Sequence, residues 1–205
     1  SFSWQELPNL YDDYDRAARI FSGEEVIENE KESRHIKRLY EASQIKETKK
    51  SIPVQFSHVA MLSQIFGDDD KVVETLKRTG HYRVERENLI LERMRLARNW
   101  AMHYVPEKDR IGLLEDYKQA KVKLSNAQKT FLEQVSGYLA GGERTSDDIQ
   151  NHIFKTAKET GLPLKTAFQA IYLSMLGTTR GPKAGTLLAS LDKDWVLKRF
   201  RDLGR

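Results

Sequence analysis

The residues best placed to contact a charged ligand lie in a short glycine-rich loop. Residues 177–185 read Gly-Thr-Thr-Arg-Gly-Pro-Lys-Ala-Gly and contain two cations, Arg180 and Lys183. The loop differs from a nucleotide phosphate-binding loop, because its second glycine, Gly181, comes one residue too early and Pro182, which lacks a backbone N–H, stands where the lysine should follow it. No strand is predicted before it. The loop is therefore not predicted to hold a nucleotide, and its cations are predicted to be available to another anionic partner.

Other catalytic or metal-binding patterns are missing from the sequence. The five histidines are scattered along the chain and show no zinc-ligand spacing. They are His35, His58, His81, His103 and His152. The chain has no cysteine, which excludes disulfides, thiol nucleophiles and cysteine-bound zinc. The acidic run 68–70 is interpreted as a helix cap rather than a cation site. We therefore predict no metal and no catalytic residue in this chain.

The charge of the chain is concentrated at one end. The formal net charge is +4, and residues 180–205 carry seven basic groups against three acidic ones, which accounts for the whole excess. A basic end on a neutral body indicates a polyanionic partner. The alternative interpretation is a solvated terminal helix.

Glycine and proline divide the sequence into segments of helical length. Apolar residues recur at helical spacing within these segments. The helices are expected at about 8–22, 36–43, 57–66, 70–79, 85–104, 109–122, 125–139, 145–160, 163–176, 187–191 and 192–200. Only 52–55 has the character of a strand. The pattern predicts an all-α protein built as a multi-helix bundle.

The pair Gly141-Gly142 is the clearest hinge, and it predicts two helical subdomains, 1–142 and 143–205. No apolar run is long enough to span a bilayer, and no signal peptide is evident. We expect a cytoplasmic protein with no membrane partner. The chain begins with Ser1 rather than Met, which suggests a piece of a longer protein.

Three stretches resemble a known family. They are Tyr14–Glu25, then Lys37–Gln44 leading into Ile52–Val54, Phe56 and Gln64-Ile65, and finally Gly161–Leu191 with its Gly-Leu-Pro start and its Arg180-Gly181-Pro182 turn. In this order they resemble the C-terminal region of class I lysyl-tRNA synthetases. The last stretch is also similar, more distantly, to the anticodon-binding end of glutamyl-tRNA synthetases.

This resemblance implies a helical region of the α-helix cage type, which holds the anticodon stem-loop of a tRNA. It implies that 1–142 connects and contacts the stem, and that 143–205 binds the anticodon. The parent enzyme would join lysine to tRNA with ATP, using H-x-G-H and K-M-S-K-S signatures. Neither is present, since Glu47–Ser51 matches only the last two letters of the second. The chain alone is therefore expected to be non-catalytic and to hold no cofactor.

Candidate RNA contacts follow from residue type and position. Arginine and lysine hold phosphates, and aromatic rings stack on unpaired bases. The candidates are Thr178, Thr179, Arg180, Lys183, Lys193, Trp195 and Arg199 near the C-terminus, and Arg93, Arg95 and Arg98 on the long helix. Core packing is the alternative for Trp195. Salt bridges to Glu87 and Glu92 are the alternative for the long-helix arginines.

Two other functions stay open. The chain could be a stand-alone helical module for protein interaction, with a basic tail that only keeps it soluble. It could also be the equivalent end of a glutamyl-type synthetase, which changes the amino acid but not the role.

Overall fold

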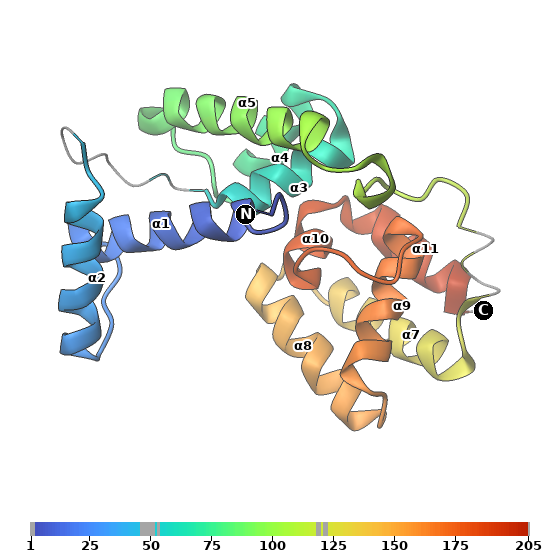
Figure 1. Ribbon diagram of the computed structural model, residues 1–205. Helices are drawn as coiled ribbons and strands as arrows, with labels where there is room; N and C mark the ends of the chain where they lie inside the picture. Colours follow the sequence, from blue (N-terminus) through green and yellow to red (C-terminus); the bar gives the residue numbers. More distant parts are fainter. Residues whose placement is uncertain (1–2, 46–51, 53, 118–119, 121–122, 205) are drawn as a thin grey trace. The chain divides into compact units, whose positions relative to one another are not determined.

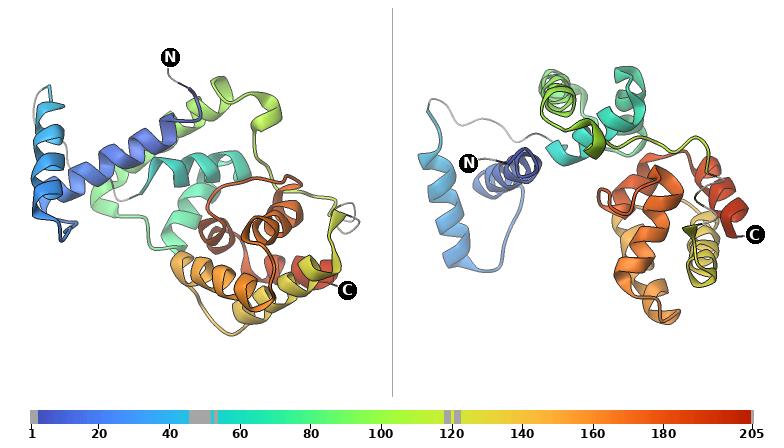
Figure 2. Two further views of the ribbon diagram at one scale, coloured as in Figure 1. Left: turned by 60° about the horizontal axis from the view of Figure 1, so that its bottom comes forward. Right: turned by 45° about the vertical axis from the view of Figure 1, so that its right-hand side comes forward.

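The computed structural model describes residues 3–45, 52, 54–117, 120 and 123–204. Within these ranges it contains ten α-helices, two short 3-10 helices and no strand (Figures 1 and 2). The predicted all-α class is confirmed. The signature-like segment Glu47–Ser51, Pro53 of the segment 52–55 and part of the helix predicted at 109–122 lie outside the described residues.

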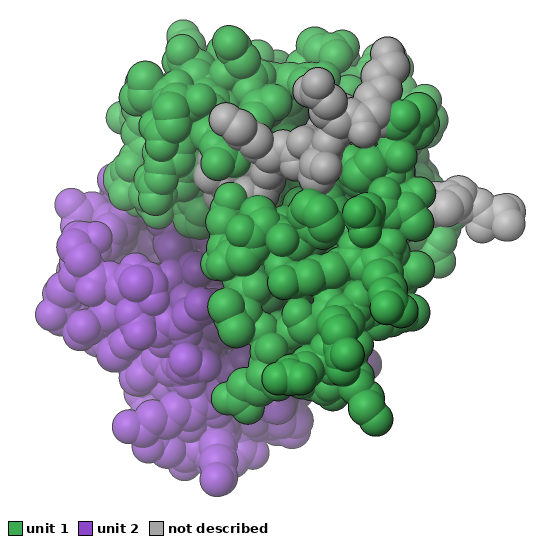
Figure 3. Space-filling model, turned by 90° about the vertical axis from the view of Figure 1, so that its left-hand side faces the viewer, with its two compact units in different colours: residues 1–110 green, residues 111–205 purple. Residues whose placement is uncertain are grey.

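The chain forms two compact units, residues 1–110 and 111–205, which Figure 3 colours separately. We predicted the boundary at Gly142, and the units do not divide there. Gly141 and Gly142 instead form the turn between two helices of unit 2, α7 and α8, which pack on each other. A glycine pair marks a tight turn equally well within a domain, and here it joins two parts of one core.

Unit 1 contains five α-helices among its described residues. They are α1 (Leu7–Ser22), α2 (Glu30–Ala42), α3 (Phe56–Phe66), α4 (Asp69–Arg78) and α5 (Glu87–His103), with 3-10 turns η1 (Val84–Arg86) and η2 (Glu107–Asp109). Helix α3 packs against α5, and α1 packs against α2 and α3. The predicted cap is confirmed, because the Asp68 carboxylate accepts a hydrogen bond from the backbone N–H of Asp70 at 3.0 Å.

Unit 2 contains α7 (Asn126–Ala140), α8 (Ser146–Glu159), α9 (Leu164–Leu176), α10 (Ala184–Ser190) and α11 (Lys193–Gly204). Helix α11 packs on α7, and α10 packs on α8. Capping boxes at Ser125 and Thr145 fix the starts of α7 and α8. Gly177 ends α9 in the left-handed conformation, with φ of 70°, as the sequence predicted.

One predicted helix is wrong over most of its length. Residues 110–117 are irregular, although Ile111, Leu114 and Tyr117 recur at helical spacing. The Leu114 N–H donates to the carbonyl of Met175 at 2.8 Å, so this backbone pairs with the end of α9 rather than with itself. The segment is therefore an extended strap across unit 2.

Gly185 in α10 allows the close approach of α10 to α8. A Cβ at this position would lie 2.1 Å from the Ser146 carbonyl oxygen and 2.9 Å from the Cβ of Gln150. The Gly185 N–H also donates to the Gln150 side chain at 2.9 Å. Only glycine fits this contact without displacing the backbone of α8.

Gly185→Ala is therefore expected to lower the free energy of unfolding by about 1–3 kcal/mol, the usual cost of overpacking. Urea unfolding followed by circular dichroism measures this change. Gly137→Ala is the matched control, because its added Cβ meets no atom within 4 Å. Alanine inside a helix should stabilise by up to about 1 kcal/mol there. Equal stability of the two variants would contradict the close contact.

Candidate nucleic-acid interface

The loop 177–183 is anchored to unit 2 by an aromatic residue of α9. The Tyr172 hydroxyl donates to the Pro182 carbonyl at 2.6 Å. A Cβ on Gly181 would lie 2.7 Å from the Tyr172 ring, so only glycine lets the loop lie on this ring. Burial raises the pKa of the Tyr172 phenol, which keeps the hydroxyl a donor. The loop therefore has a fixed base.

The tip of this loop is exposed. Thr178, Thr179 and Arg180 are all exposed, and the Thr178 hydroxyl donates to the Arg180 carbonyl at 2.6 Å. Among the described residues, Arg180 makes no ion pair. Its side chain is therefore open to solvent at the tip of the loop.

The environment of Lys183 differs from the one predicted. We predicted that it has no nearby carboxylate, but its ammonium lies 2.7 Å from the Asp147 carboxylate at the start of α8. The two residues are far apart in sequence, so local spacing could not reveal the pair. Both side chains are more than half exposed, so the pair is weak and its charge is only partly neutralised.

A row of aromatic rings leads along unit 2 to this loop, and the sequence analysis missed it. Phe154 of α8 lies edge-on to Phe168 of α9, with ring centroids 5.6 Å apart, and Phe168 stacks towards Tyr172 at 6.4 Å. Phe154 is 42% exposed. Phe168 and Tyr172 are four residues apart on one helix face, a spacing that could have indicated the row. Phe154 and the half-buried Phe168 offer a surface for stacking, and the row ends at the buried Tyr172 under the loop.

A second, half-buried stack lies on α7 and α8. The Tyr138 and His152 rings are parallel within 9° at 3.7 Å, and the Arg144 guanidinium lies 4.5 Å from the Tyr138 ring. Burial, followed by the nearby Lys155, lowers the pKa of His152. No local pattern of residues predicts this stack, because its members come from two helices and the turn between them.

The α11 candidates are less accessible than predicted. The Lys193 ammonium donates to the Gly142 carbonyl at 3.0 Å. Trp195 is half-buried, and the guanidinium of Arg199 lies 4.0 Å from its ring. Trp195 is therefore neither a fully buried core residue nor a fully open ring for base stacking.

Arg199 is a buried structural residue. Its guanidinium donates to the carbonyls of Leu114 and Ser174, the latter at 3.2 Å, and it is 5% exposed. Burial lowers its pKa. It fastens the 110–117 strap to α9 and α11, so our assignment of Arg199 to an RNA surface is corrected.

The three long-helix arginines have three different environments in unit 1. Arg93 is buried and pairs with Asp15, so its assignment to an RNA surface is also corrected. Arg98 lies 2.6 Å from the Asp69 carboxylate and donates to the Gly67 carbonyl at 3.1 Å. Arg95 is exposed and makes no ion pair among the described residues. The proposed partners Glu87 and Glu92 are not the ones that Arg93 and Arg98 use.

The described residues show neither a metal site nor a helix that could span a membrane. No group of three or more histidines or carboxylates within them is arranged to hold a metal ion. None of their helices is both long and apolar enough to cross a membrane.

Comparison with known proteins agrees with this geometry. Residues 102–203 match the family described as "Anticodon binding domain". The chain is 35% identical over 206 residues to lysine–tRNA ligase of Thermococcus kodakarensis, covering 95% of this chain and 38% of that protein. It is 32% identical to the Methanosphaera stadtmanae enzyme of the same name, covering 94% and 39%, and 31% identical to that of Methanocaldococcus jannaschii, covering 97% and 40%.

The chain thus spans about two fifths of the length of these relatives. The matched residues include the strap, the anchored loop, helices α7 to α10 and α11 up to residue 203. Residues 102–203 thus match the anticodon binding domain family, and over nearly its whole length the chain is similar to lysine–tRNA ligases.

Proposed function

We propose that this chain binds the anticodon stem-loop of a lysine tRNA, as one part of a lysine–tRNA ligase. The anchored loop 177–183 carries the argument, because it presents a guanidinium that makes no ion pair among the described residues, and it lies on the buried end of an aromatic row whose other end, Phe154, is exposed. Unpaired RNA bases stack on such rings, while arginine holds the adjoining phosphate. Lysine is favoured over glutamate by the names of the relatives.

The parent protein, in this proposal, joins lysine to tRNA with ATP. None of the described residues is assigned a catalytic role, and ATP would bind in a part of the parent outside this chain. Cytoplasmic location belongs to the same proposal, since lysine–tRNA ligation there supplies translation.

In this proposal different residues of unit 2 contact the phosphate and the bases of the RNA. Arg180 is exposed at the tip of a loop whose base is fixed by Tyr172. A fixed base limits the conformational entropy that the loop loses on binding. Phe154 and Phe168 lie beyond Tyr172 along the same row. A base placed on these rings would lie beside a phosphate held by Arg180.

Arg180→Ala is expected to weaken tRNA binding equally for every anticodon sequence, because a phosphate contact carries no base information. The slope of log affinity against log salt should become shallower by about 0.7–0.9. Filter binding or fluorescence titration at several salt concentrations measures both effects. Arg34→Ala, an exposed arginine of α2, is the matched control and should change neither.

Lys183→Ala should have the smaller effect of the two loop variants, because Asp147 already neutralises part of its charge. A loss in Arg180→Ala that depends on the anticodon would assign this side chain to a base edge instead. An unchanged salt slope would remove Arg180 from the interface.

Phe154→Ala is expected to weaken tRNA binding by about 1–3 kcal/mol while leaving the fold intact, since the ring is 42% exposed. Phe154→Leu is the matched variant, because it keeps an apolar side chain and removes only the ring. Both should lose affinity, as measured by titration, with little change in melting temperature. Full affinity in Phe154→Leu would indicate that the row is an apolar contact surface, as in a protein-interaction module.

A further inference from the structure

A polar cavity of about 410 Å³ lies within unit 1. Its walls come from the end of α1, the segment before α3, α3 itself and the 79–86 segment. Its charged and titratable lining residues are Arg19, Glu24, His58, His81, Arg83, Glu85 and Arg86. Cations outnumber carboxylates on this lining, and the volume is in the range of small-ligand sites.

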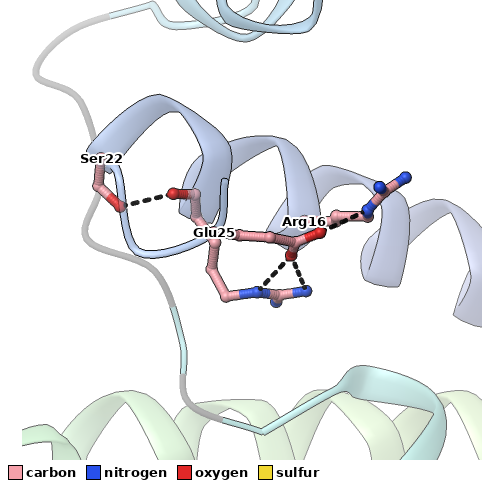
Figure 4. A network of polar contacts seen from close by, with 4 residues as sticks. Arg16, Ser22 and Glu25 are labelled. Carbon is pink, nitrogen blue, oxygen red and sulfur yellow. Dashed lines mark hydrogen bonds and ion pairs between the residues drawn. The ribbon is translucent and has the colours of Figure 1, made fainter. Parts of the chain in front are cut away.

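Two of the three arginines have carboxylate partners. The Glu25 carboxylate lies 2.8 Å from Nε of Arg16 and 3.1 Å from a terminal nitrogen of Arg19 (Figure 4). The Ser22 hydroxyl donates to the Arg19 carbonyl at 3.1 Å, which fixes the same turn. The Arg16 hydrogen bond, with help from Arg19, lowers the pKa of the Glu25 carboxyl. The Arg19 side chain is therefore held in place at the wall of the cavity.

Arg86 lies 3.8 Å from the Glu24 carboxylate, a long ion pair. Arg83 differs from both. Its Nη1 donates to the carbonyls of Gly80 at 2.9 Å and Tyr82 at 3.1 Å, and it makes no ion pair among the described residues. Its Nε and Nη2 have no acceptor within the described part of the chain. A guanidinium with two unused adjacent donors matches the geometry of a phosphate.

Two histidines complete the wall. The His58 and His81 rings meet edge to face with centroids 4.8 Å apart, and His58 is 6% exposed. Burial, with the nearby Arg83, lowers the pKa of His81, and burial with His81 lowers the pKa of His58 to about 3. Without a ligand both rings are neutral at physiological pH. An anion in the cavity would favour their protonated forms, so binding would take up protons.

We propose that this cavity binds a phosphate ester, held by Arg83 and by the histidine pair. The ligand chemistry has two possible sources, a backbone phosphate of the tRNA or a free nucleotide. Arg19 and Arg86 add positive charge around the ligand. The carboxylates of Glu24 and Glu85 limit the negative charge of the ligand that the site can hold. The cavity belongs to unit 1 and the proposed anticodon interface to unit 2, so one proposal can fail without the other.

The test is a titration of the whole 205-residue chain with inorganic phosphate, sulfate and AMP, followed by the NMR signals of the histidine rings. Saturable shifts are expected for His58 and His81, with His152 in unit 2 as the internal control. Sulfate does not change its charge in this range, and it should bind more tightly as the pH falls from about 7.5 to about 5.5. Arg83→Gln should weaken binding roughly tenfold or more, the effect of one charge-assisted hydrogen bond.

Arg34→Gln is the matched control for charge and should leave the titration unchanged. Competition separates the two sources. If saturating tRNA displaces phosphate, and Arg83→Gln weakens tRNA binding, the ligand is the RNA backbone. If AMP binds more tightly than phosphate and persists with tRNA bound, the ligand is a free nucleotide. Shifts that do not saturate, or that are the same in Arg83→Gln and Arg34→Gln, would overturn the proposal.

Discussion

Arg93→Ala is expected to lower the free energy of unfolding of unit 1 by about 3–5 kcal/mol, because it leaves a buried carboxylate without its partner. Asp15 is 3% exposed and Arg93 is 4% exposed. The guanidinium donates to both carboxylate oxygens, to one of them at 2.9 Å, and to the Val54 carbonyl at 2.8 Å. One side chain thus connects α1, α5 and the segment before α3.

Urea unfolding combined with hydrogen exchange resolved by peptide measures this loss in unit 1 separately from unit 2. Arg95→Ala is the matched control, since Arg95 lies on the same helix but is exposed, and it should change stability by less than about 0.5 kcal/mol. Asp15→Asn combined with Arg93→Ala in a double-mutant cycle should reveal strong coupling. A loss below about 1 kcal/mol in Arg93→Ala would contradict the buried pair.

Unit 1 is expected to lose stability as the pH falls below about 6.5, by about 1.4 kcal/mol for each pH unit per histidine. The pKa of His58 is about 3 in the folded chain, from burial and the neighbouring His81, against an ordinary value of 6.5. The unfolded chain therefore binds a proton that the folded chain excludes. The stability is present above pH 6.5 and is lost progressively towards pH 3. His81 has a lowered pKa as well and acts in the same direction.

The informative window lies between about pH 6.5 and pH 4.5, where carboxylates are still ionised and histidines dominate the change. Unfolding in anion-poor buffer should follow this slope, because a bound anion would favour the protonated rings. His58→Gln should flatten the slope for unit 1 whatever its effect on stability at neutral pH. The same slope in the variant and the parent chain would contradict the buried, neutral His58.

Local signals in the sequence predicted the helices well. Asp68, Ser125 and Thr145 cap helices because their side chains bond backbone groups two or three residues away. Gly177 ends α9 because a left-handed residue is needed there. Such interactions lie within a few residues, so the residue types alone specify them.

Interactions between distant segments could not be read in this way. Arg93 and Arg95 are both arginines on α5, yet only Arg93 meets a carboxylate, on α1, 78 residues earlier. The helical spacing in 110–117 was misleading because its backbone bonds to Met175 and Arg199 instead. For the same reason the sequence analysis missed the partner of Lys183, which is Asp147 on α8.

The central claim is tested most directly by titrating the chain with labelled lysine tRNA and with the same tRNA carrying a changed anticodon. We expect saturable binding of the first and at least roughly tenfold weaker binding of the second, since one lost base contact costs about 1–3 kcal/mol. Arg180→Ala should weaken both to the same degree. Equal affinity of the chain for the two tRNAs, or no saturable binding to either, would contradict an anticodon-binding role.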